Sequence, residues 1–520
     1  MSFKFSGTSD LSVGKRLLML AAALATIGGA VVFKLNGYGF GPLMSGTSTF
    51  HTIAVLVCVA AAAVALPFLG KLSAEKNFLV IWTLLSLVYV FSGTVLKTPD
   101  ETGHFYRSFE ISCGYAVSEV QEGTAQGGRE LPLDVDVTLL EKSWRSFSEN
   151  KDMSLTENKP FIVFTNLSLY CPVSYLPQAV GIFTARLFTK NVAAIAYAGR
   201  LANWLTITLM LFIAVKTMPV KKELLLLIAL LPMNVYLAFS LSPDGLVVAL
   251  SLLMFAYVMY LRFEQAEPLS VRQYILLYIM ALVICLLKIV YLPICMVYFL
   301  IPAERFGSMK SKIIHAVIMA SAAVACNLVW LMICKKFLTI PGTDANEQLR
   351  YMMSDPLNYV TVMVRTAIHY GVRWALMMIG GYLGTIDIET SKLLAFAYLF
   401  MLVIAFIDIP AIIAKRRRGG TSEKAVWSEN IVFGVIVFAI LMLINASLYM
   451  QWTPPHSPLI KGIQGRYFIA LLLPLYFTIH NPTKTVSESE PAGEARIFFC
   501  EYLITLVNVC AGVDVLLACL

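Results

Sequence analysis

The chain has 520 residues, of which 58% are hydrophobic and only 14% are charged, too little polar surface to cover a soluble globule. Composition therefore predicts an all-α polytopic integral membrane protein. The formal net charge of +8 would suggest nucleic acid in a soluble protein, but here much of the excess lies in short connectors between apolar runs, where membrane orientation explains it, and no nucleic-acid partner is expected.

Apolar runs long enough to cross about 30 Å of hydrocarbon recur along the chain. The first, 15–34, starts with basic residues as a signal peptide does, but it is longer than a typical signal-peptide core and we expect a retained span. The other long runs are 51–69, 78–96, 193–215, 223–241, 245–262, 312–334, 391–413, 427–450 and 497–519, and shorter ones are 273–287, 289–303 and 466–480. One domain over 1–520 with about 11–14 transmembrane helices is predicted.

Basic residues gather in alternate connectors between these runs. With the N-terminus in the cytoplasm, the positive-inside rule places those connectors on the cytoplasmic side. Their basic residues are Lys71, Lys76, Lys216, Lys221, Lys222, Arg262, Arg272, Arg305, Lys310, Lys312, Lys415, Arg416, Arg417, Arg418, Lys484 and Arg496. The opposite side then receives a large loop, 97–192, with short juxtamembrane helices, a second region at 335–390, the 242–244 turn and 451–465. Polar groups on one face favour an enzyme acting on lipid headgroups over a transporter, which needs them near the bilayer midplane.

The large loop opens on a polar segment, 97–107, that contains two acids, a histidine and an arginine. The sequence 98–101 predicts a helix start in which Thr98 is the N-cap and Glu101 completes a capping box. The helix should end near Gly114. Asp100 is then the stronger functional candidate, whereas Glu101 either assists the chemistry or only caps the helix.

On the expected helix, Asp100, His104 and Arg107 share one face. Glycosyl transfer from a lipid-phosphate sugar suits such a set, because a carboxylate takes the proton from an acceptor hydroxyl and cations hold the departing phosphate. This reaction needs no nucleotide, and the chain contains no GxxxxGK[ST] motif.

Two later cations have the position that a phosphate site requires. Arg466, in the segment 464–468 that opens a late span, either anchors that span at the headgroups or clamps a phosphate with its guanidinium, while Gly465 lets backbone approach the ligand. Lys288 interrupts an apolar hairpin between 273–287 and 289–303. It is either a hairpin-tip anchor or a contact to the donor phosphate.

Other candidates lie on the same side of the membrane. Asp244, in a Ser-Pro-Asp-Gly turn, either caps the following helix or takes part in catalysis or acceptor binding. Arg365, His369 and Arg373 form a basic stripe on an expected helix, which either faces phospholipid headgroups or guides an anionic donor. The segment 170–177 should continue as an amphipathic helix through Leu187, as an interfacial anchor or as a substrate contact.

Most of the ten cysteines lie within apolar runs and suit packing. Cys113 and Cys171 both lie in the large loop. If their compartment is oxidising, they could pair and close that loop, with a stabilisation of about 4 kcal/mol in the chain-entropy model.

Together, these short motifs resemble a known family. The acidic pair in Pro99-Asp100-Glu101 with His104, at the start of a large outer loop, resembles the modified acidic motif of the GT-C superfamily of polyprenyl-phosphate-sugar-dependent glycosyltransferases. The segments 170–177, 242–244 and 464–468 are similar to those of a bacterial branch of predicted membrane proteins of unassigned function. The likeness covers residues from about 80 to about 480.

The resemblance implies a GT-C-like fold in the bacterial cytoplasmic (inner) membrane, with an extracytoplasmic active site. It implies an inverting glycosyltransferase that moves a sugar from a polyprenyl-phosphate donor to a cell-envelope glycan, a lipid-linked glycan or a protein. Asp100 would be the base, and Glu101 would assist it or join it in binding a divalent cation such as Mg²⁺ or Mn²⁺. The donor phosphate would be bound by Arg466, Lys288, His104 and Arg107, and substrate contacts would come from Asp244, Gln464 and Tyr175.

Two other classes of function make different predictions. A transporter or flippase of lipid-linked sugars requires a polar path that continues to the cytoplasmic side. A membrane scaffold would leave the acid and the cations without a common pocket. The enzyme hypothesis requires Asp100, Lys288 and Arg466 to converge, because a sugar phosphate cannot bridge groups more than about 20 Å apart.

Overall fold

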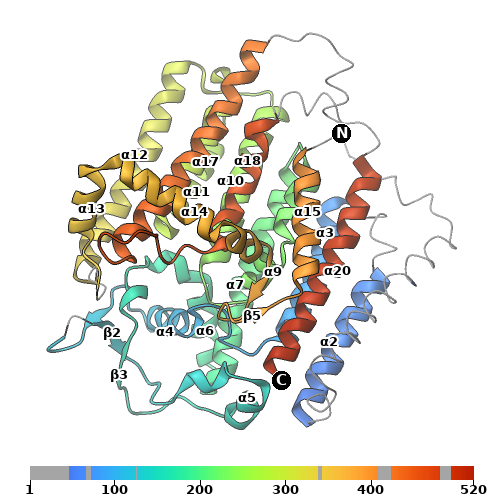
Figure 1. Cartoon of the computed structure of the whole chain (residues 1–520), viewed down its shortest axis with the longest axis vertical. Helices are drawn as coiled ribbons and strands as arrows, with labels where there is room; N and C mark the ends of the chain where they lie inside the picture. Colours follow the sequence, from blue (N-terminus) through green and yellow to red (C-terminus); the bar gives the residue numbers. More distant parts are fainter. Residues whose placement is uncertain are drawn as a thin grey trace.

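The computed structural model describes residues 21, 46–65, 72–124, 126–337, 342–407, 423–480 and 493–520. Apart from residue 21, the predicted first span at 15–34 lies outside these residues. So do several of the basic connector residues, namely Lys71, Lys415, Arg416, Arg417, Arg418 and Lys484. The described residues form mainly helices, in agreement with the predicted fold class (Figure 1).

The long helices lie side by side and form the body of the protein (Figure 1). They are α2 (Gly46–Ala65), α3 (Ala74–Ser92), α7 (Val192–Thr217), α10 (Asp244–Phe263), α11 (Val271–Leu287), α12 (Met309–Cys334), α15 (Lys392–Ile407), α17 (Glu423–Gln451) and α20 (Gly493–Cys519). Five helical segments within the described residues are long and apolar enough to cross a membrane: Ala74–Ser92, Val192–Thr217, Asp244–Phe263, Met309–Phe337 and Glu429–Gln451. Several further apolar helices are shorter than a full span, and three of them, Val271–Leu287, Ile289–Leu300 and Gly465–Ile479, match the shorter runs predicted from the sequence.

The predicted span 223–241 is broken into α8 (Lys222–Ala229) and α9 (Pro232–Ala238). Pro232 has no backbone N–H and suits the start of the second helix. Two asparagine side chains satisfy the carbonyls at the break, since Asn234 donates to Ala229 O at 2.8 Å and Asn508 donates to Leu230 O at 2.9 Å. A backbone break inside an apolar body is stable only with such partners.

Two other predicted spans contain 3₁₀ helix. The run 289–303 forms η6 (Ile289–Leu300), followed by η7 (Ala303–Phe306), and the run 466–480 forms η9 (Gly465–Leu471) and α18 (Leu472–Ile479). Lys288 lies between α11 and η6, as the predicted hairpin requires. Both breaks place a charged residue at the end of an apolar helix rather than at its centre.

The 97–192 region forms a small layer beside the ends of α3 and α7. Its elements are α4 (Glu101–Ser112), β1 (Glu119–Val120), β2 (Gly127–Glu130), η3 (Val137–Leu140), α5 (Trp144–Asn150), β3 (Phe161–Val163), η4 (Thr165–Leu167), η5 (Pro172–Tyr175) and α6 (Leu176–Arg186). The strands form an antiparallel sheet of order β1-β2-β3, with Arg129 opposite Ile162. The predicted short helices are present, whereas these strands of two to four residues carry too little pattern to be predicted.

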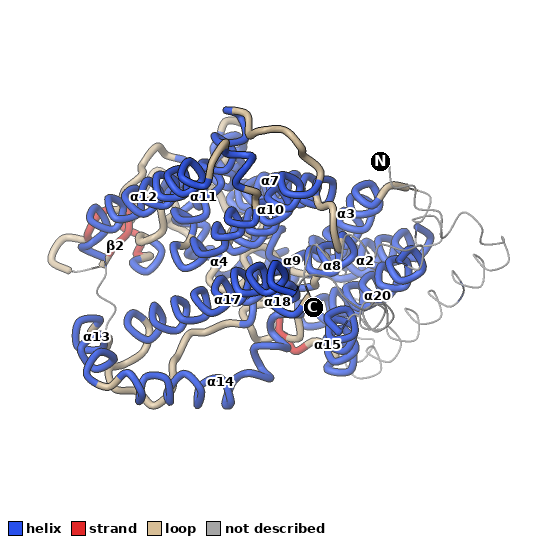
Figure 2. Tube along the Cα trace, turned by 90° about the horizontal axis from the view of Figure 1, so that it is seen from above, coloured by secondary structure: helices blue, strands red, loops and turns tan. Residues whose placement is uncertain are grey.

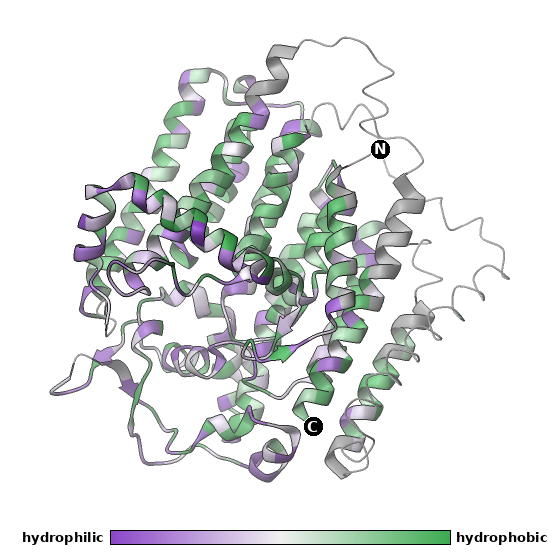
Figure 3. Ribbon diagram, viewed as in Figure 1, coloured by the Kyte–Doolittle hydropathy of each residue, from purple (hydrophilic) through white to green (hydrophobic). Residues whose placement is uncertain are grey.

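A separate apolar core holds this layer together. It includes Phe105, Phe109 and Val137 and reaches α7 through Val192 and Ile195. In Figure 3 hydrophilic residues are frequent in this layer, and the long helices above it are mostly hydrophobic. The boundary between the layer and the helix ends is therefore where polar side chains meet apolar spans.

The 335–390 region contains η8 (Lys335–Phe337), α13 (Ala345–Ser354), α14 (Pro356–Ile379), β4 (Tyr382–Leu383) and β5 (Ile388–Glu389). β4 and β5 pair as an antiparallel hairpin. α14 runs across the direction of the long helices, as both Figure 1 and Figure 2 show. An ion pair of 2.9 Å between Lys97 Nζ and Asp387 Oδ2 joins this region to the start of the 97–192 region.

Candidate functional site

Asp244 is the centre of a buried cluster of charges. Its Oδ1 accepts a hydrogen bond from Lys288 Nζ at 2.5 Å, and its Oδ2 accepts one from Arg466 Nε at 2.5 Å. All three side chains are largely shielded from solvent. Buried charges are tolerated only when they are paired, so each member of this trio depends on the others.

The trio is assembled from three parts of the chain that lie at helix ends. Asp244 is the first residue of α10, Lys288 follows the last residue of α11, and Arg466 is the second residue of η9. The expectation that Asp244 only caps its helix is too simple, because its carboxylate is directed to the two cations. With one carboxylate and two cationic side chains, the trio has one uncompensated positive charge.

Asp100 completes the cluster on its exposed side. Its Oδ2 lies 3.8 Å from Arg466 Nη2, and its side chain is 66% exposed. The backbone of Asp100 is left-handed, with φ 61° and ψ 11°, a conformation that aspartate tolerates better than most residues. Asp100, Lys288 and Arg466 are therefore linked in one cluster through Arg466 and Asp244.

Tyrosine rings surround the lysine. Lys288 Nζ lies 4.7 Å from the ring centroid of Tyr467 and 5.8 Å from that of Tyr170, within the range of cation–π attraction. Tyr291 holds this arrangement by donating its hydroxyl to Tyr467 O at 2.9 Å. The cation thus has a polar partner on one side and aromatic faces on others, an environment that suits an amphiphilic ligand.

His104 and Tyr175 form a buried hydrogen-bonded pair of 2.8 Å between Nδ1 and the phenol oxygen. Burial raises the pKa of Tyr175 well above its ordinary value, so the phenol keeps its proton and donates it to the ring. Burial, reinforced by the charges of Arg466 and Lys288, lowers the pKa of His104 to about 3. We infer a neutral imidazole with its proton on Nε2.

The low pKa of His104 predicts a loss of stability in acid. Below about pH 6.5 the unfolded chain binds a proton on this ring that the folded protein does not, so stability falls as the pH drops from about 6.5 towards 3. In His104→Gln this contribution should vanish, and the unfolding temperature should fall less between about pH 7 and about pH 5 than in the wild type. His369→Gln, at an exposed histidine, is the matched control. An equal loss in His104→Gln and the wild type would contradict the assignment.

Glu101 lies outside the charged cluster. Its Oε1 accepts from Arg200 Nε at 2.7 Å and from the Leu241 amide at 2.9 Å, and its Oε2 accepts from Arg200 Nη2 at 2.6 Å and from the Thr98 amide at 2.9 Å. Both oxygens are occupied and fully buried. The geometry therefore gives Glu101 the structural role, and the proposed second catalytic or metal-binding acid is not available. The N-cap position belongs to Asp100 rather than to Thr98.

The Glu101–Arg200 pair ties α4 to α7 and to the turn before Asp244, so its loss should be costly. Glu101→Gln leaves the buried Arg200 guanidinium without its counter-ion and is expected to destabilise the protein by about 3–5 kcal/mol. Thermal or denaturant unfolding of the purified protein in detergent measures this. Glu141→Gln, at a half-buried acid that accepts from the Thr102 hydroxyl, is the matched control and should cost less. Similar stabilities of the two variants would argue against a structural role for Glu101.

Arg107 is also directed away from the cluster. It pairs with Glu110 and donates to Ala116 O at 2.8 Å and to Tyr170 O at 3.1 Å. Glu110 in turn accepts from Arg129 Nε at 2.8 Å. The expectation that Arg107 binds phosphate beneath Asp100 is therefore wrong, because its side chain is buried in the packing of the 97–192 region.

The segment around Arg466 differs from expectation in one respect. Gly465 is a packing residue, since a Cβ at this position would come within 2.1 Å of Trp374 O on α14. It therefore serves the contact between η9 and α14 rather than the approach of backbone to a ligand. Gln464 occupies the N-cap position of η9, and its buried Oε1 has no hydrogen-bond partner among the described residues. An unsatisfied acceptor two residues from Arg466 is consistent with the predicted substrate contact.

Neither the predicted disulfide nor a metal centre is formed by the described residues. Cys113 and Cys171 are both free thiols, and Cys113 Sγ accepts from Arg186 Nη1 at 3.1 Å. No group of three or more His, Cys, Asp or Glu side chains within the described residues has a geometry that could hold a metal ion. Because both carboxylate oxygens of Glu101 already accept hydrogen bonds from Arg200, the pair Asp100 and Glu101 does not fit a divalent cation.

Arg200 is the residue that sequence reasoning missed. It lies within the apolar run 193–215, and a charged residue inside a span requires a partner. That signal was present, but its partner Glu101 is 99 positions away in sequence.

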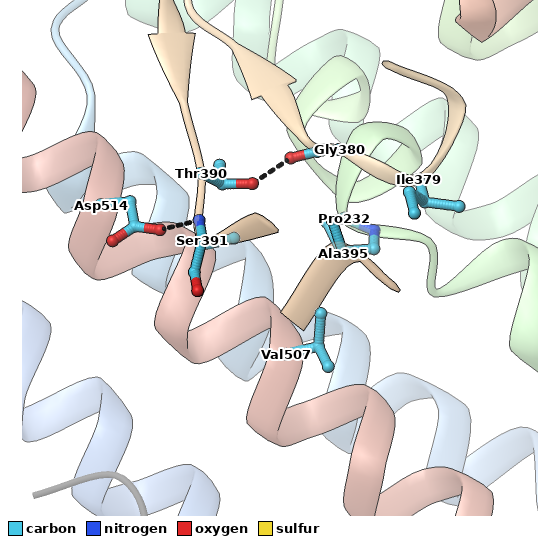
Figure 4. Close-up of a pocket in the computed structure, with 9 residues that line it drawn as sticks. Pro232, Ile379, Gly380, Thr390, Ser391, Ala395, Val507 and Asp514 are labelled. Atoms are coloured by element: carbon cyan, nitrogen blue, oxygen red, sulfur yellow. Dashed lines mark hydrogen bonds between the residues drawn. The ribbon is translucent and has the colours of Figure 1, made fainter. Parts of the chain in front are cut away.

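A small pocket lies elsewhere, between α9, α14, α15 and α20 (Figure 4). Asp514 Oδ2 accepts from the Ser391 amide at 2.7 Å, and Thr390 donates its hydroxyl to Gly380 O at 2.9 Å. The residues that line this pocket include no cation and no member of the charged cluster. It therefore does not form part of the candidate site.

The helices and the buried charges at their ends define a polytopic helical membrane protein with a polar site beside its spans. The chain belongs to the family described as predicted membrane protein (DUF2142), whose sequence model matches residues 79–475. This range contains every residue of the charged cluster. No curated protein and no solved structure matches the chain.

Proposed function

We propose that this protein is an inverting glycosyltransferase that uses a polyprenyl-phosphate sugar as its donor, at the extracytoplasmic face of the bacterial cytoplasmic membrane. One observation carries the proposal: an exposed carboxylate, Asp100, lies 3.8 Å from the buried Arg466, which Asp244 joins to a second cation, Lys288, at the ends of apolar helices. A base and a phosphate-binding pair are the two parts that this reaction needs from a protein. The acceptor is a hydroxyl of a glycan, a lipid-linked glycan or a protein.

In the proposed reaction Asp100 takes the proton from the acceptor hydroxyl. The acceptor oxygen attacks the anomeric carbon, and the bond between that carbon and the phosphate oxygen breaks, with inversion. The bonding pair leaves on polyprenyl phosphate, which gains one negative charge while Asp100 loses one. Arg466 can bind phosphate oxygens through its guanidinium, and Lys288 adds a second cation at the same place.

The charge balance of the cluster suits this sequence of events. Asp244 neutralises one of the two cations, so the trio carries one net positive charge, and the nearby Asp100 carboxylate balances that charge before proton transfer. When Asp100 becomes protonated, the site gains positive character just as the leaving phosphate becomes a dianion. Charges arranged before the reaction cost no reorganisation during it.

The position of the cluster favours an enzyme over a transporter of the same lipids. A transporter is expected to hold its substrate groups near the bilayer midplane, where either side can reach them. Here Asp244, Lys288 and Arg466 each lie at the end of a helix, next to the 97–192 region. A glycosyltransferase cleaves the donor, whereas a transporter moves it intact, and this difference can be measured.

The test is to incubate the purified protein in detergent micelles with polyprenyl-phosphate hexoses radiolabelled in the sugar, together with cell-envelope glycan as acceptor. We expect the label to move to the acceptor and free polyprenyl phosphate to appear, although no sealed membrane is present. The matched comparison is the same protein in sealed vesicles with the donor in one leaflet. Movement of intact donor between leaflets, without cleavage in either preparation, would overturn the proposal in favour of a flippase.

A further inference from the structure

The helix α14 has an apolar face that the described residues leave uncovered. Its inner side packs on the protein through residues such as Tyr359, Val362 and Thr366. The opposite side carries a stripe of five apolar side chains that are between 48% and 80% exposed: Leu357, Val360, Val364, Ile368 and Val372. Their spacing of three and four residues places them along one side of the helix.

A polar, basic stripe runs beside the apolar one. Thr361, Arg365, His369 and Arg373 follow each other at intervals of four, and all four are exposed. The Arg373 guanidinium, near the C-terminal end of the helix, lies 5.4 Å from the ring centroid of Tyr382. No aspartate or glutamate occurs between Pro356 and Ile379, so the exposed side of α14 carries basic but no acidic residues.

The direction of α14 separates it from the spans. At 24 residues it is long enough to cross a bilayer, yet it is not among the helical segments apolar enough to do so. It runs across the long helices (Figures 1 and 2). A helix that has one apolar face and a basic border, and that runs across the spans, has the properties of an element that lies in the membrane interface.

We propose that α14 lies in the plane of the membrane, with its apolar stripe among lipid acyl chains and with Arg365 and Arg373 bound to the phosphate groups of anionic lipids. Charge complementarity selects the occupant, since two arginines without any acid attract anionic headgroups. The contact of α14 with Gly465 places Arg466 next to this lipid-bound helix. Anionic-lipid binding goes beyond the proposed transfer reaction and does not require it.

The test places a photo-crosslinking amino acid, p-benzoylphenylalanine, at Ile368 or at Thr361 in the full chain. The protein is reconstituted in vesicles of phosphatidylcholine mixed with phosphatidylglycerol, and adducts are identified by mass spectrometry after illumination. We expect adducts to lipid acyl chains mainly from position 368, in the apolar stripe, and few acyl-chain adducts from position 361, in the basic stripe. A crosslinked dimer without lipid adducts would show that a second copy covers the stripe, and would overturn the proposal.

The anionic preference is tested in the same preparation. In the wild-type background, phosphatidylglycerol should be enriched roughly fivefold over its bulk fraction among the adducts at position 368. The double variant Arg365→Gln/Arg373→Gln should return the ratio to that of the bulk lipid, because both side chains are exposed and their loss should not disturb folding. Arg145→Gln, at another highly exposed arginine, is the matched control. A bulk ratio in the wild type, or an unchanged enrichment in the double variant, would overturn the assignment of these arginines.

Discussion

Asp100→Asn is expected to lower sugar transfer by about 10²–10⁴-fold, the usual contribution of a positioned general base. Asparagine keeps the shape of the side chain and tolerates the left-handed backbone observed at this position. It cannot accept the proton of the acceptor hydroxyl. Because the Asp100 side chain is 66% exposed and 3.8 Å from Arg466, the substitution should leave stability almost unchanged. The measurement is kcat/KM for release of polyprenyl phosphate, together with the unfolding temperature.

A matched acid tests whether the effect belongs to this position. Glu122→Gln removes an exposed carboxylate from the same 97–192 region and should not slow transfer. Asp100→Glu restores a base on a longer side chain and should recover part of the rate. Undiminished transfer by Asp100→Asn would remove this residue as the base, while leaving the fold and the cluster as described.

Asp244→Asn is expected to cost about 3–5 kcal/mol of stability, because it leaves two buried cations without their shared counter-ion. The two hydrogen bonds of 2.5 Å that Lys288 and Arg466 donate would no longer have a negatively charged acceptor. An anion that binds between the cations should compensate. We therefore expect inorganic phosphate to raise the unfolding temperature of Asp244→Asn more than that of the wild type, in which Asp244 already neutralises one of the two cations.

The control for this prediction is a weaker ion pair. Glu223→Gln affects an acid on α8 whose oxygen is 3.8 Å from Lys221 Nζ, and it should change stability little. The unfolding temperatures in phosphate must be compared with those in chloride at the same ionic strength, so that general screening of charge is separated from phosphate binding. If phosphate stabilises neither Asp244→Asn nor the wild type, the two cations do not form an anion site.

The residues of the candidate site could be predicted only in part. Lys288 and Arg466 stood out because each is a charged residue at the end of an apolar run, where an unpaired charge is costly, and Asp100 stood out because it lies where a span meets the large loop. Their convergence does not follow from sequence spacing, since the contact between Asp244 and Arg466 joins residues 222 positions apart. Helical spacing placed Arg107 beside Asp100, yet a nearby acid, Glu110, provides a better-matched buried partner.

The fold shows the same limit at its broken helices. The run 223–241 has the apolar length of a span, and length was the property used to predict it. Its break depends on side chains from elsewhere, such as Asn508, which satisfies the Leu230 carbonyl. Hydropathy does not contain that information.

By itself the sequence determined that this is a helical membrane protein, and it marked the acid and the two cations at span ends, because apolar length and interrupting charges are local properties of the chain. The tertiary structure alone decided the partner of each charge. In the fold, Glu101 pairs with Arg200, and Asp244 lies between Lys288 and Arg466. Asp100 stays exposed, 3.8 Å from Arg466. In an apolar interior each charge must be neutralised by whichever opposite charge the packing brings within reach, and only the folded arrangement of distant segments sets that choice.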